Sequence, residues 1–279
     1  MIVIEDVSFR YPSTTQDVLS NVTLNVNDGE FVAIMGENGA GKTTLVKMLN
    51  GLLKPTKGRV IIDNSETGNK SVAELSRDVG LIFQNPDHQL FAETVSEELS
   101  FSLRNFGFAE DVIQRRITHI LTSLDLQKYS NTSPFILSGG ERKRVALAAT
   151  LVWNPKHIIM DEPTIGQDYL QKDRLRNFIV QLISQGKTII IVTHDVEFVA
   201  ECNPRVVLLS KGKILADGPA TQILTRSDLV EKASLVRPQI TELMQQLNEK
   251  DAPPDIVEPY AARAFLTPKL HAAQTSTGG

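Results

Sequence analysis

Continuous apolar runs alternate along this chain with segments of helical spacing. The runs at Phe31–Met35, Val79–Phe83, His157–Met160 and Thr188–Thr193 do not alternate with polar residues, which is typical of strands buried on both faces of a parallel sheet. Segments long enough for helices separate these runs. The pattern therefore predicts an α/β fold with a mostly parallel sheet that helices cover on both sides.

Shorter β-rich stretches open and close this pattern. Ile2–Ile4 and Val22–Val26 are separated by turn-forming residues and are predicted strands. Val206–Leu209 and Lys213–Ala216 are split by Ser210–Gly212, which predicts a closing hairpin.

Helical spacing dominates three other stretches. A helix is predicted after Gly36 through Leu52, and a larger helical insertion between Ala92 and Leu126. After about residue 224 the composition changes: a helix is predicted over Leu235–Leu247, and the proline-containing residues from Asp251 onward are predicted to form a loosely ordered tail. We therefore expect a main domain over residues 1–224, with a helical subdomain at about 85–150, and an extension over residues 225–279.

Composition excludes several classes of protein. The chain has 29 Lys and Arg against 33 Asp and Glu, a net charge of −4, which argues against a general affinity for nucleic acid. Its single cysteine, Cys202, permits no internal disulfide. It has no basic and apolar leader at the N-terminus, and no apolar run approaches the roughly 18 residues of a membrane span. Membrane association is expected only through a partner.

A phosphate-binding motif follows the first buried strand. Gly36–Thr43 reads GENGAGKT, a full match to GxxxxGK[ST], and it lies between a predicted strand and a predicted helix, where such a loop can point its amides at phosphates. The amides of Asn38, Gly39, Ala40 and Gly41 would bind phosphate oxygens, and Lys42 would reach the β- and γ-phosphates. Thr43 would ligate Mg²⁺ and Thr44 would help to bind the α-phosphate.

A second acidic motif ends a later buried strand. His157–Glu162 reads HIIMDE, and a strand-end aspartate can hold Mg²⁺ together with a hydroxyl of the phosphate loop. Asp161 is assigned that role. Glu162 is the candidate to polarise the water that attacks ATP.

The segment Leu137–Glu141 reads LSGGE and precedes the acidic strand by one predicted helix. With these motifs in this order, the sequence over roughly residues 1–224 resembles the ABC ATPase family. The resemblance implies a nucleotide-binding domain whose P-loop core is joined by an antiparallel β subdomain and by a helical subdomain that carries LSGGE. It also implies catalysis of ATP hydrolysis.

The resemblance assigns further residues. Gln84 matches the glutamine expected to touch Mg²⁺ and sense the γ-phosphate, and His194 matches the histidine that contacts the γ-phosphate. Tyr11, in FRYP, matches an aromatic residue that stacks on adenine, and Asp168 matches the D-loop aspartate. Two features depart from the usual pattern: Ile165 and Gln167 stand in a D-loop that commonly reads SALD or SGLD, and Arg142-Lys143-Arg144 follows the signature in place of Lys-Gln-Arg.

The resemblance also implies a partner subunit. In this family two domains pack head to tail, so Ser138 and Gly140 would serve the nucleotide of a second ATPase subunit, either the same chain or a paralogue. ATP would hold the pair closed and hydrolysis would release it.

The residues Gln84–Phe91, QNPDHQLF, are similar to a segment of the ATPases of energy-coupling-factor (ECF) importers. That likeness implies a peripheral protein on the cytoplasmic face of the membrane, importing a vitamin or a transition-metal ion with a transmembrane coupling subunit and a substrate-binding membrane protein. Leu90 and Phe91 would then form part of an apolar dock, and simple core packing is the alternative for these two residues. A soluble ABC ATPase of DNA repair or translation is the alternative, but the chain has no long heptad insert and only one domain. A P-loop small-molecule kinase leaves LSGGE and His194 unexplained.

Overall fold

The computed structural model of the protein describes residues 1–247, 253 and 255–276. The chain divides into two compact units, each built from two segments. The first unit comprises Met1–Phe31 and Thr43–Val192, and the second comprises Val32–Lys42 and Thr193–Gly279. No helix in the described parts of the chain is long and apolar enough to cross a bilayer.

The first unit contains an antiparallel sheet with strand order β2-β1-β4-β5. Its strands are β1 (Ile2–Phe9), β2 (Leu19–Val26), β4 (Lys57–Ile62) and β5 (Ser65–Glu66). Buried and exposed residues alternate along much of β2, because an antiparallel strand buries one face and leaves the other in water. The expected antiparallel β subdomain is confirmed.

A parallel set of strands in the same unit runs in the order β8-β7-β6. These strands are β6 (Val79–Ile82), β7 (His157–Asp161) and β8 (Thr188–Thr193), and every residue of β7 and β8 is buried. Their register pairs Ile82 with Met160 and Asp161 with Val192. Because the strands are parallel, the residues that follow β6 and β7 emerge at the same edge of the sheet.

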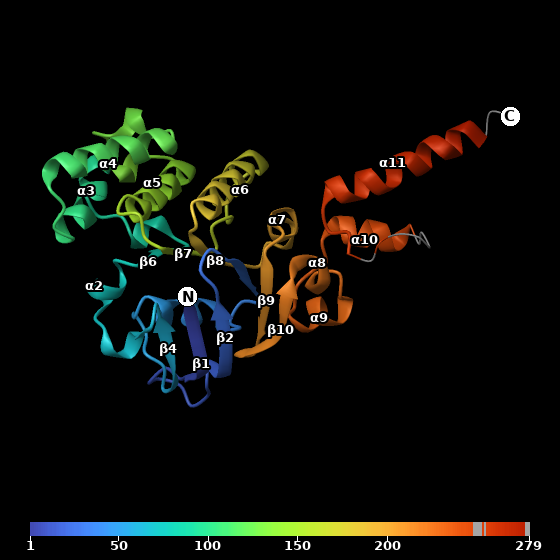
Figure 1. The fold of residues 1–279 in the computed structure, drawn as a ribbon, viewed down its shortest axis with the longest axis horizontal. Helices are drawn as coiled ribbons and strands as arrows, with labels where there is room; N and C mark the ends of the chain where they lie inside the picture. The colour runs from blue at the N-terminus through green and yellow to red at the C-terminus, as the bar shows by residue number, and fades with distance from the viewer. Residues whose placement is uncertain (248–252, 254, 277–279) are drawn as a thin grey trace. The chain divides into compact units, whose positions relative to one another are not determined.

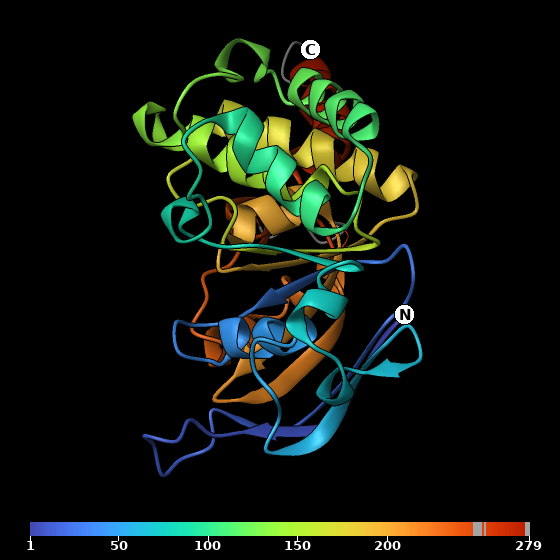
Figure 2. The same cartoon turned by 90° about the vertical axis from the view of Figure 1, so that its left-hand side faces the viewer.

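Helices complete the first unit. Two are short: α1 (Lys42–Leu49), which belongs to this unit from Thr43 onward, and α2 (Val72–Leu75). The longer helices are α3 (Val95–Asn105), α4 (Glu110–Ser123), α5 (Gly139–Leu151) and α6 (Tyr169–Ser184). Figures 1 and 2 show α3, α4 and α5 gathered on one side of β6 and β7, with β1, β2 and β4 on the other. The helix expected after Gly36 ends earlier than predicted, because Gly51 takes a φ of +77° and leaves Leu52 outside α1.

The second unit joins β3 (Phe31–Met35) in parallel to β9 (Arg205–Ser210), and β9 turns back into β10 (Lys213–Pro219) as the expected hairpin. Its helices are α7 (Val196–Cys202), α8 (Ala220–Ile223), α9 (Ser227–Lys232), α10 (Gln239–Gln246) and α11 (Pro259–Ser276).

The C-terminal region differs from its sequence-based description in two places. The helix predicted from Leu235 begins only at Gln239, because Pro238 caps α10 and cannot continue a helix toward its N-terminal side. The predicted loose tail is wrong for Pro259–Ser276, which form α11. Proline is tolerated in the first turn of a helix, and α11 buries Ala262 against Met244. Residues 251, 252, 254 and 277–279 of the predicted tail lie outside the described residues.

Candidate functional site

The phosphate loop lies between β3 and α1 and is shaped by a close backbone approach. Gly36 has a φ of +150°, and a Cβ atom placed there would lie 2.0 Å from the carbonyl oxygen of Leu209. Only glycine fits this position without displacing β9. Lys42 is buried, and its Nζ donates hydrogen bonds to the carbonyl oxygens of Gly36 at 2.7 Å and Glu37 at 2.9 Å. The ammonium is thereby held against the loop.

The four predicted amide donors of this loop, Asn38 to Gly41, occupy the turn itself. Ala40 closes the turn by donating its amide to Glu37 O at 3.2 Å, and its own carbonyl accepts from the amide of Gly212 at 3.1 Å. Gly39 and Gly41 both have positive φ, at +85° and +103°. The glycines therefore provide backbone conformations that other residues rarely adopt.

Two of the three predicted magnesium ligands, Thr43 and Asp161, meet in the first unit. Thr43 Oγ1 donates a hydrogen bond to Asp161 Oδ2 at 2.9 Å, joining the first turn of α1 to the end of β7. Asp161 is buried. A hydroxyl and a carboxylate are the hard oxygen donors that Mg²⁺ prefers, so these residues fit that ion.

Tyr11 and Thr44 also come together. The two hydroxyl oxygens lie 3.2 Å apart, and the ring of Tyr11 packs edge-on against Phe9 with ring centroids 4.8 Å apart. Thr44 is buried. The adenine-stacking role of Tyr11 stays a prediction, and its hydroxyl contacts Thr44, the residue that follows the predicted metal ligand Thr43.

Glu162 is held in an uncommon backbone conformation directly after β7. Its φ is +49°, and its amide donates to the carbonyl of Val192 at 2.7 Å, which fixes the turn against β8. The residue is only 6% exposed. A glutamate with positive φ costs conformational energy, and such strain tends to occur at functional positions.

The signature residues form the start of α5. Ser138 is the N-cap, its hydroxyl oxygen accepts from the amide of Glu141, and Glu141 reaches back to the amide of Ser138 at 2.9 Å. The hydroxyl of Tyr129 donates to Glu141 as well. Hydrogen bonds from Tyr129 and then Ser138 lower the pKa of Glu141 to about 2. Ser138 is exposed at the tip of the helix, and Gly140 is half-buried.

Two other predicted residues follow parallel strands. Gln84 follows β6, is exposed, and lies at the same sheet edge as Asp161 because β6 and β7 are parallel. His194 follows β8 and is also exposed. The roles of Gln84 and His194 in ATP hydrolysis stay predictions. Asp168 caps α6 by accepting the amide of Gln171 at 2.8 Å.

Sequence reasoning missed two polar anchors near Gln84. The side chain of Gln89 donates to Ala146 O at 2.8 Å and Thr150 Oγ1 at 3.0 Å, which ties the segment to α5. Glu98 is buried, and its Oε2 accepts the amides of Phe91 and Ala92 at 2.9 and 2.8 Å. Gln89 lies within the segment QNPDHQLF, whose likeness to ECF ATPases the sequence shows. Nothing in the local sequence predicts that Glu98 is buried.

The predicted apolar dock divides into a core residue and a surface residue. Leu90 is buried, whereas Phe91 is 58% exposed. Phe91 packs edge-on against Phe101, itself exposed, with ring centroids 4.7 Å apart. Phe91 and Phe101 therefore offer an apolar surface to a partner, whereas the buried Leu90 does not.

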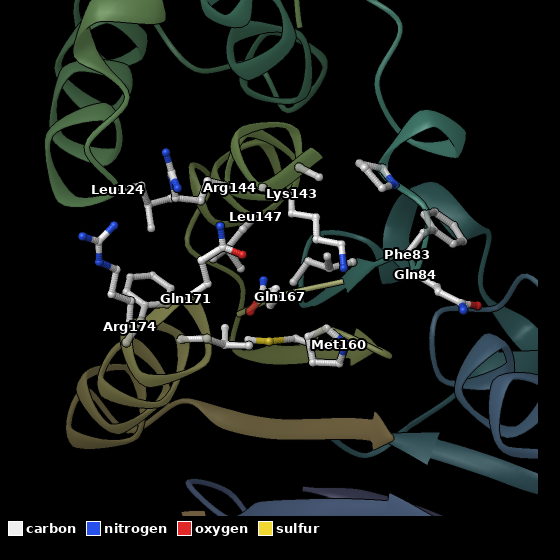
Figure 3. Close-up of a pocket in the computed structure, with 17 residues that line it drawn as sticks. Phe83, Gln84, Leu124, Lys143, Arg144, Leu147, Met160, Gln167, Gln171 and Arg174 are labelled. Atoms are coloured by element: carbon white, nitrogen blue, oxygen red, sulfur yellow. The ribbon is translucent and has the colours of Figure 1, made fainter. Parts of the chain in front are cut away.

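A cavity of about 100 Å³ lies behind this segment, between α5, α6 and the ends of β6 and β7. Figure 3 shows Lys143, Leu147, Met160, Gln167 and Gln171 around it, with the amide of Gln84 pointing away from Gln167. The ammonium of Lys143 donates to the carbonyl of Ile165. Burial lowers the pKa of Lys143.

Comparison with known proteins gives concordant results. The family model described as ABC transporter matches residues 19–165. The chain is 39% identical over 257 residues to the energy-coupling factor transporter ATP-binding protein EcfA2 of Clostridium tetani, with 89% of each chain covered.

Solved structures extend the likeness to the fold. The structure of cbiO1 from Clostridium perfringens, part of the ABC transporter complex cbiONQ, matches with a TM-score of 0.75 and 33% identity, covering 88% of this chain and 98% of that one. A dimeric, post-hydrolysis ATP-binding cassette, MJ0796 bound to ADP and Pi, matches with a TM-score of 0.71 and 31% identity, covering 79% and 99%. These matches confirm the expected α/β fold class.

Proposed function

Because the chain belongs to the ABC transporter family, in which it is an ATP-binding and ATP-hydrolysing subunit, we propose that it energises an ECF-type importer of a vitamin or a transition-metal ion. The observation that carries this proposal is the 39% identity to an energy-coupling factor ATPase along 89% of the chain. The segment QNPDHQLF at Gln84–Phe91 supports the same subclass.

Each site residue has a proposed task in hydrolysis. The amides of residues 38–41 and the ammonium of Lys42 bind the phosphates, and Thr44 assists at the α-phosphate. Tyr11 stacks on adenine. Glu162 polarises the attacking water, and His194 contacts the γ-phosphate.

Three residues would hold Mg²⁺: Thr43, Asp161 and Gln84. The hydroxyl of Thr43 and the carboxylate of Asp161 already lie 2.9 Å apart, which suits ligands of one ion. When bound, the ion neutralises negative charge on the phosphates.

The complete site is proposed to need a second ATPase subunit, the same chain or a paralogue. Ser138 and Gly140 stand at the exposed start of α5, where amides and the positive end of the helix favour a phosphate. They would bind the nucleotide held by the phosphate loop of the second subunit. ATP would thereby close the pair.

The importer also requires membrane partners. Phe91 and Phe101 form an exposed aromatic pair, and we propose that this pair receives a helix of the transmembrane coupling subunit. The ATPase would then be peripheral, on the cytoplasmic face of the membrane, and a separate membrane protein would bind the imported substrate. No nucleic acid is proposed as a partner.

The closing of the pair is tested by Glu162→Gln. This change keeps the shape and hydrogen-bonding capacity of the side chain but removes the carboxylate. It should reduce turnover by at least about a hundredfold while ATP binding is retained. Sedimentation should then show a stable dimer with ATP and Mg²⁺, with the paralogue added if one exists. A monomer under all these conditions would contradict the proposal, and adding Ser138→Arg is the control that should abolish the dimer.

The importer subclass is tested by co-purification. The chain should be recovered from detergent-solubilised membranes together with a multispanning membrane protein, and Phe91→Asp combined with Phe101→Asp should prevent this without changing ATP binding. Recovery with ribosomes or DNA in place of a membrane protein would indicate a soluble ABC ATPase.

A further inference from the structure

The two departures from the usual sequence pattern, Lys143 and the D-loop residues Ile165 and Gln167, lie in one place. The Lys143 ammonium, from the first turns of α5, donates to the carbonyl of Ile165 in the loop between β7 and α6. Lys143 is half-buried, and its hydrogen bond is of the charge-assisted kind, which is stronger than one between neutral groups.

Three residues on one face of α5 contribute to this contact. Gly140, Lys143 and Leu147 recur at intervals of three and four residues, and all three line the cavity against α6. A Cβ atom at Gly140 would lie 3.0 Å from Nε2 of Gln171, so the helix and α6 approach closely there. Lys143 extends this contact from α6 to the preceding loop.

The loop that Lys143 holds is the one that begins with Glu162. Within this loop the amide of Ile165 donates to Glu162 O at 3.4 Å and the amide of Gln167 donates to Thr164 O at 3.1 Å. Gln167 Oε1 is buried with no hydrogen-bond partner within the part of the chain that the structure describes. The hydrogen bond from the charged side chain of Lys143 is a restraint on this loop that comes from the signature helix.

We infer that Lys143 is a positioning residue that couples the signature helix to the Glu162 loop of the same chain. The inference rests on the proposed function, in which Ser138 and Gly140 grip the nucleotide of the partner while Glu162 acts on the chain's own nucleotide. A movement of α5 caused by nucleotide on one side is passed through Lys143 to the glutamate on the other. The two sites of the dimer then respond to each other.

The chain offers a matched control for this lysine. Lys187 donates to the main-chain carbonyl oxygens of Asn154 at 3.1 Å and Pro155 at 2.7 Å, and burial lowers its pKa as it does for Lys143. Lys187 therefore shares the burial and the type of hydrogen bond of Lys143, but it touches neither the signature helix nor the D-loop in any hydrogen bond described here.

The test compares Lys143→Met, Lys143→Arg and Lys187→Met with the unchanged chain. Methionine keeps most of the apolar stem and removes the donor. ATP hydrolysis is measured against ATP concentration, and nucleotide affinity is measured separately. Lys143→Met should lower the Hill coefficient from about 2 toward 1 and the rate roughly tenfold, at unchanged affinity of the monomer for ATP. Lys143→Arg should restore both, and Lys187→Met should change neither.

The outcomes separate the inference from the function on which it rests. If Lys143→Met and Lys187→Met give the same Hill coefficient and rate, or if the unchanged chain has a Hill coefficient of 1, the coupling role is wrong. If instead Glu162→Gln fails to dimerise with ATP, the proposed function fails first. Circular dichroism of each variant confirms that a changed rate does not come from unfolding.

Discussion

At the residue scale, ordinary side-chain chemistry does much of the positioning in the signature. Glu141 completes the capping box of α5 and accepts the hydroxyl of Tyr129. These bonds stabilise the charged form of the carboxylate, which is why its pKa falls to about 2. Glu141 thus links the tip of the signature helix to the preceding segment.

This linkage predicts a pH dependence of stability. A carboxylate with a lowered folded-state pKa stabilises the fold fully above its unfolded pKa of about 4.5, and the contribution is lost as pH falls through about 2. Glu141→Gln can keep the capping box but cannot titrate. Urea unfolding of the variant should therefore lose less stability than the unchanged chain between pH 4.5 and pH 2. Equal losses would show that Glu141 is not linked to folding in this way.

At the element scale, buried anchors hold segments that have no regular structure. Glu98 lies inside α3 and accepts two amides of the segment before the helix, Phe91 and Ala92. The exposed aromatic pair depends on this anchor, since Phe91 is one of its two members. A buried carboxylate in α3 thus fixes the part of the proposed docking segment that contains Phe91, while Gln89 ties the preceding part to α5.

Removing the Glu98 anchor should affect both stability and docking. Glu98→Ala leaves two amides without their acceptor and is expected to cost about 1–3 kcal/mol in urea unfolding. It should also reduce co-purification with the membrane partner. Glu97→Ala is the matched control, because Glu97 is the exposed neighbour in the same turn and its carboxylate accepts the amide of Thr94 in the helix cap. Equal effects of the two changes would contradict the anchoring role.

At the same scale, buried apolar runs predicted the central strands, but partly polar elements escaped prediction. β4 begins with Lys57-Gly58-Arg59, and its pairing with β1 and β5 identifies it as a strand. The prolines of Pro259–Ser276 favour a loose tail when the sequence is considered alone, whereas in the structure Pro259 begins α11 and Ala262 is buried. Both elements depend on tertiary contacts, which the local sequence does not reveal.

The site shows the same division between local and long-range information. Thr43, Asp161 and Ser138 were predicted because their motifs specify a loop, a strand end and a helix start. The hydrogen bonds of Lys143 to Ile165 and of Tyr11 to Thr44 join residues distant in sequence. No spacing rule predicts such pairs, because they depend on how the elements pack.

At the scale of the whole molecule, the proposed pairing of two subunits predicts complementation between two inactive variants. Ser138→Arg should damage only the partner's site, and Lys42→Ala only the chain's own. In a homodimer, mixing the two should restore activity that neither has alone, because one of the two shared sites is then intact. Up to roughly a quarter of the full rate is expected from equal amounts, measured as phosphate release. No recovery, when the two variants are shown to associate, would contradict a shared site.

The left-handed backbone of Glu162 has a consequence for how this protein can change. Glycine would occupy that conformation without strain. The residue that best suits the turn therefore lacks the carboxylate that is proposed to polarise water. Replacing the glutamate would relieve on the order of 1 kcal/mol of strain and leave the chain unable to polarise water. Selection for thermal stability alone would therefore favour substitutions of Glu162 that stabilise the fold and inactivate the ATPase. Selection for transport must oppose such substitutions.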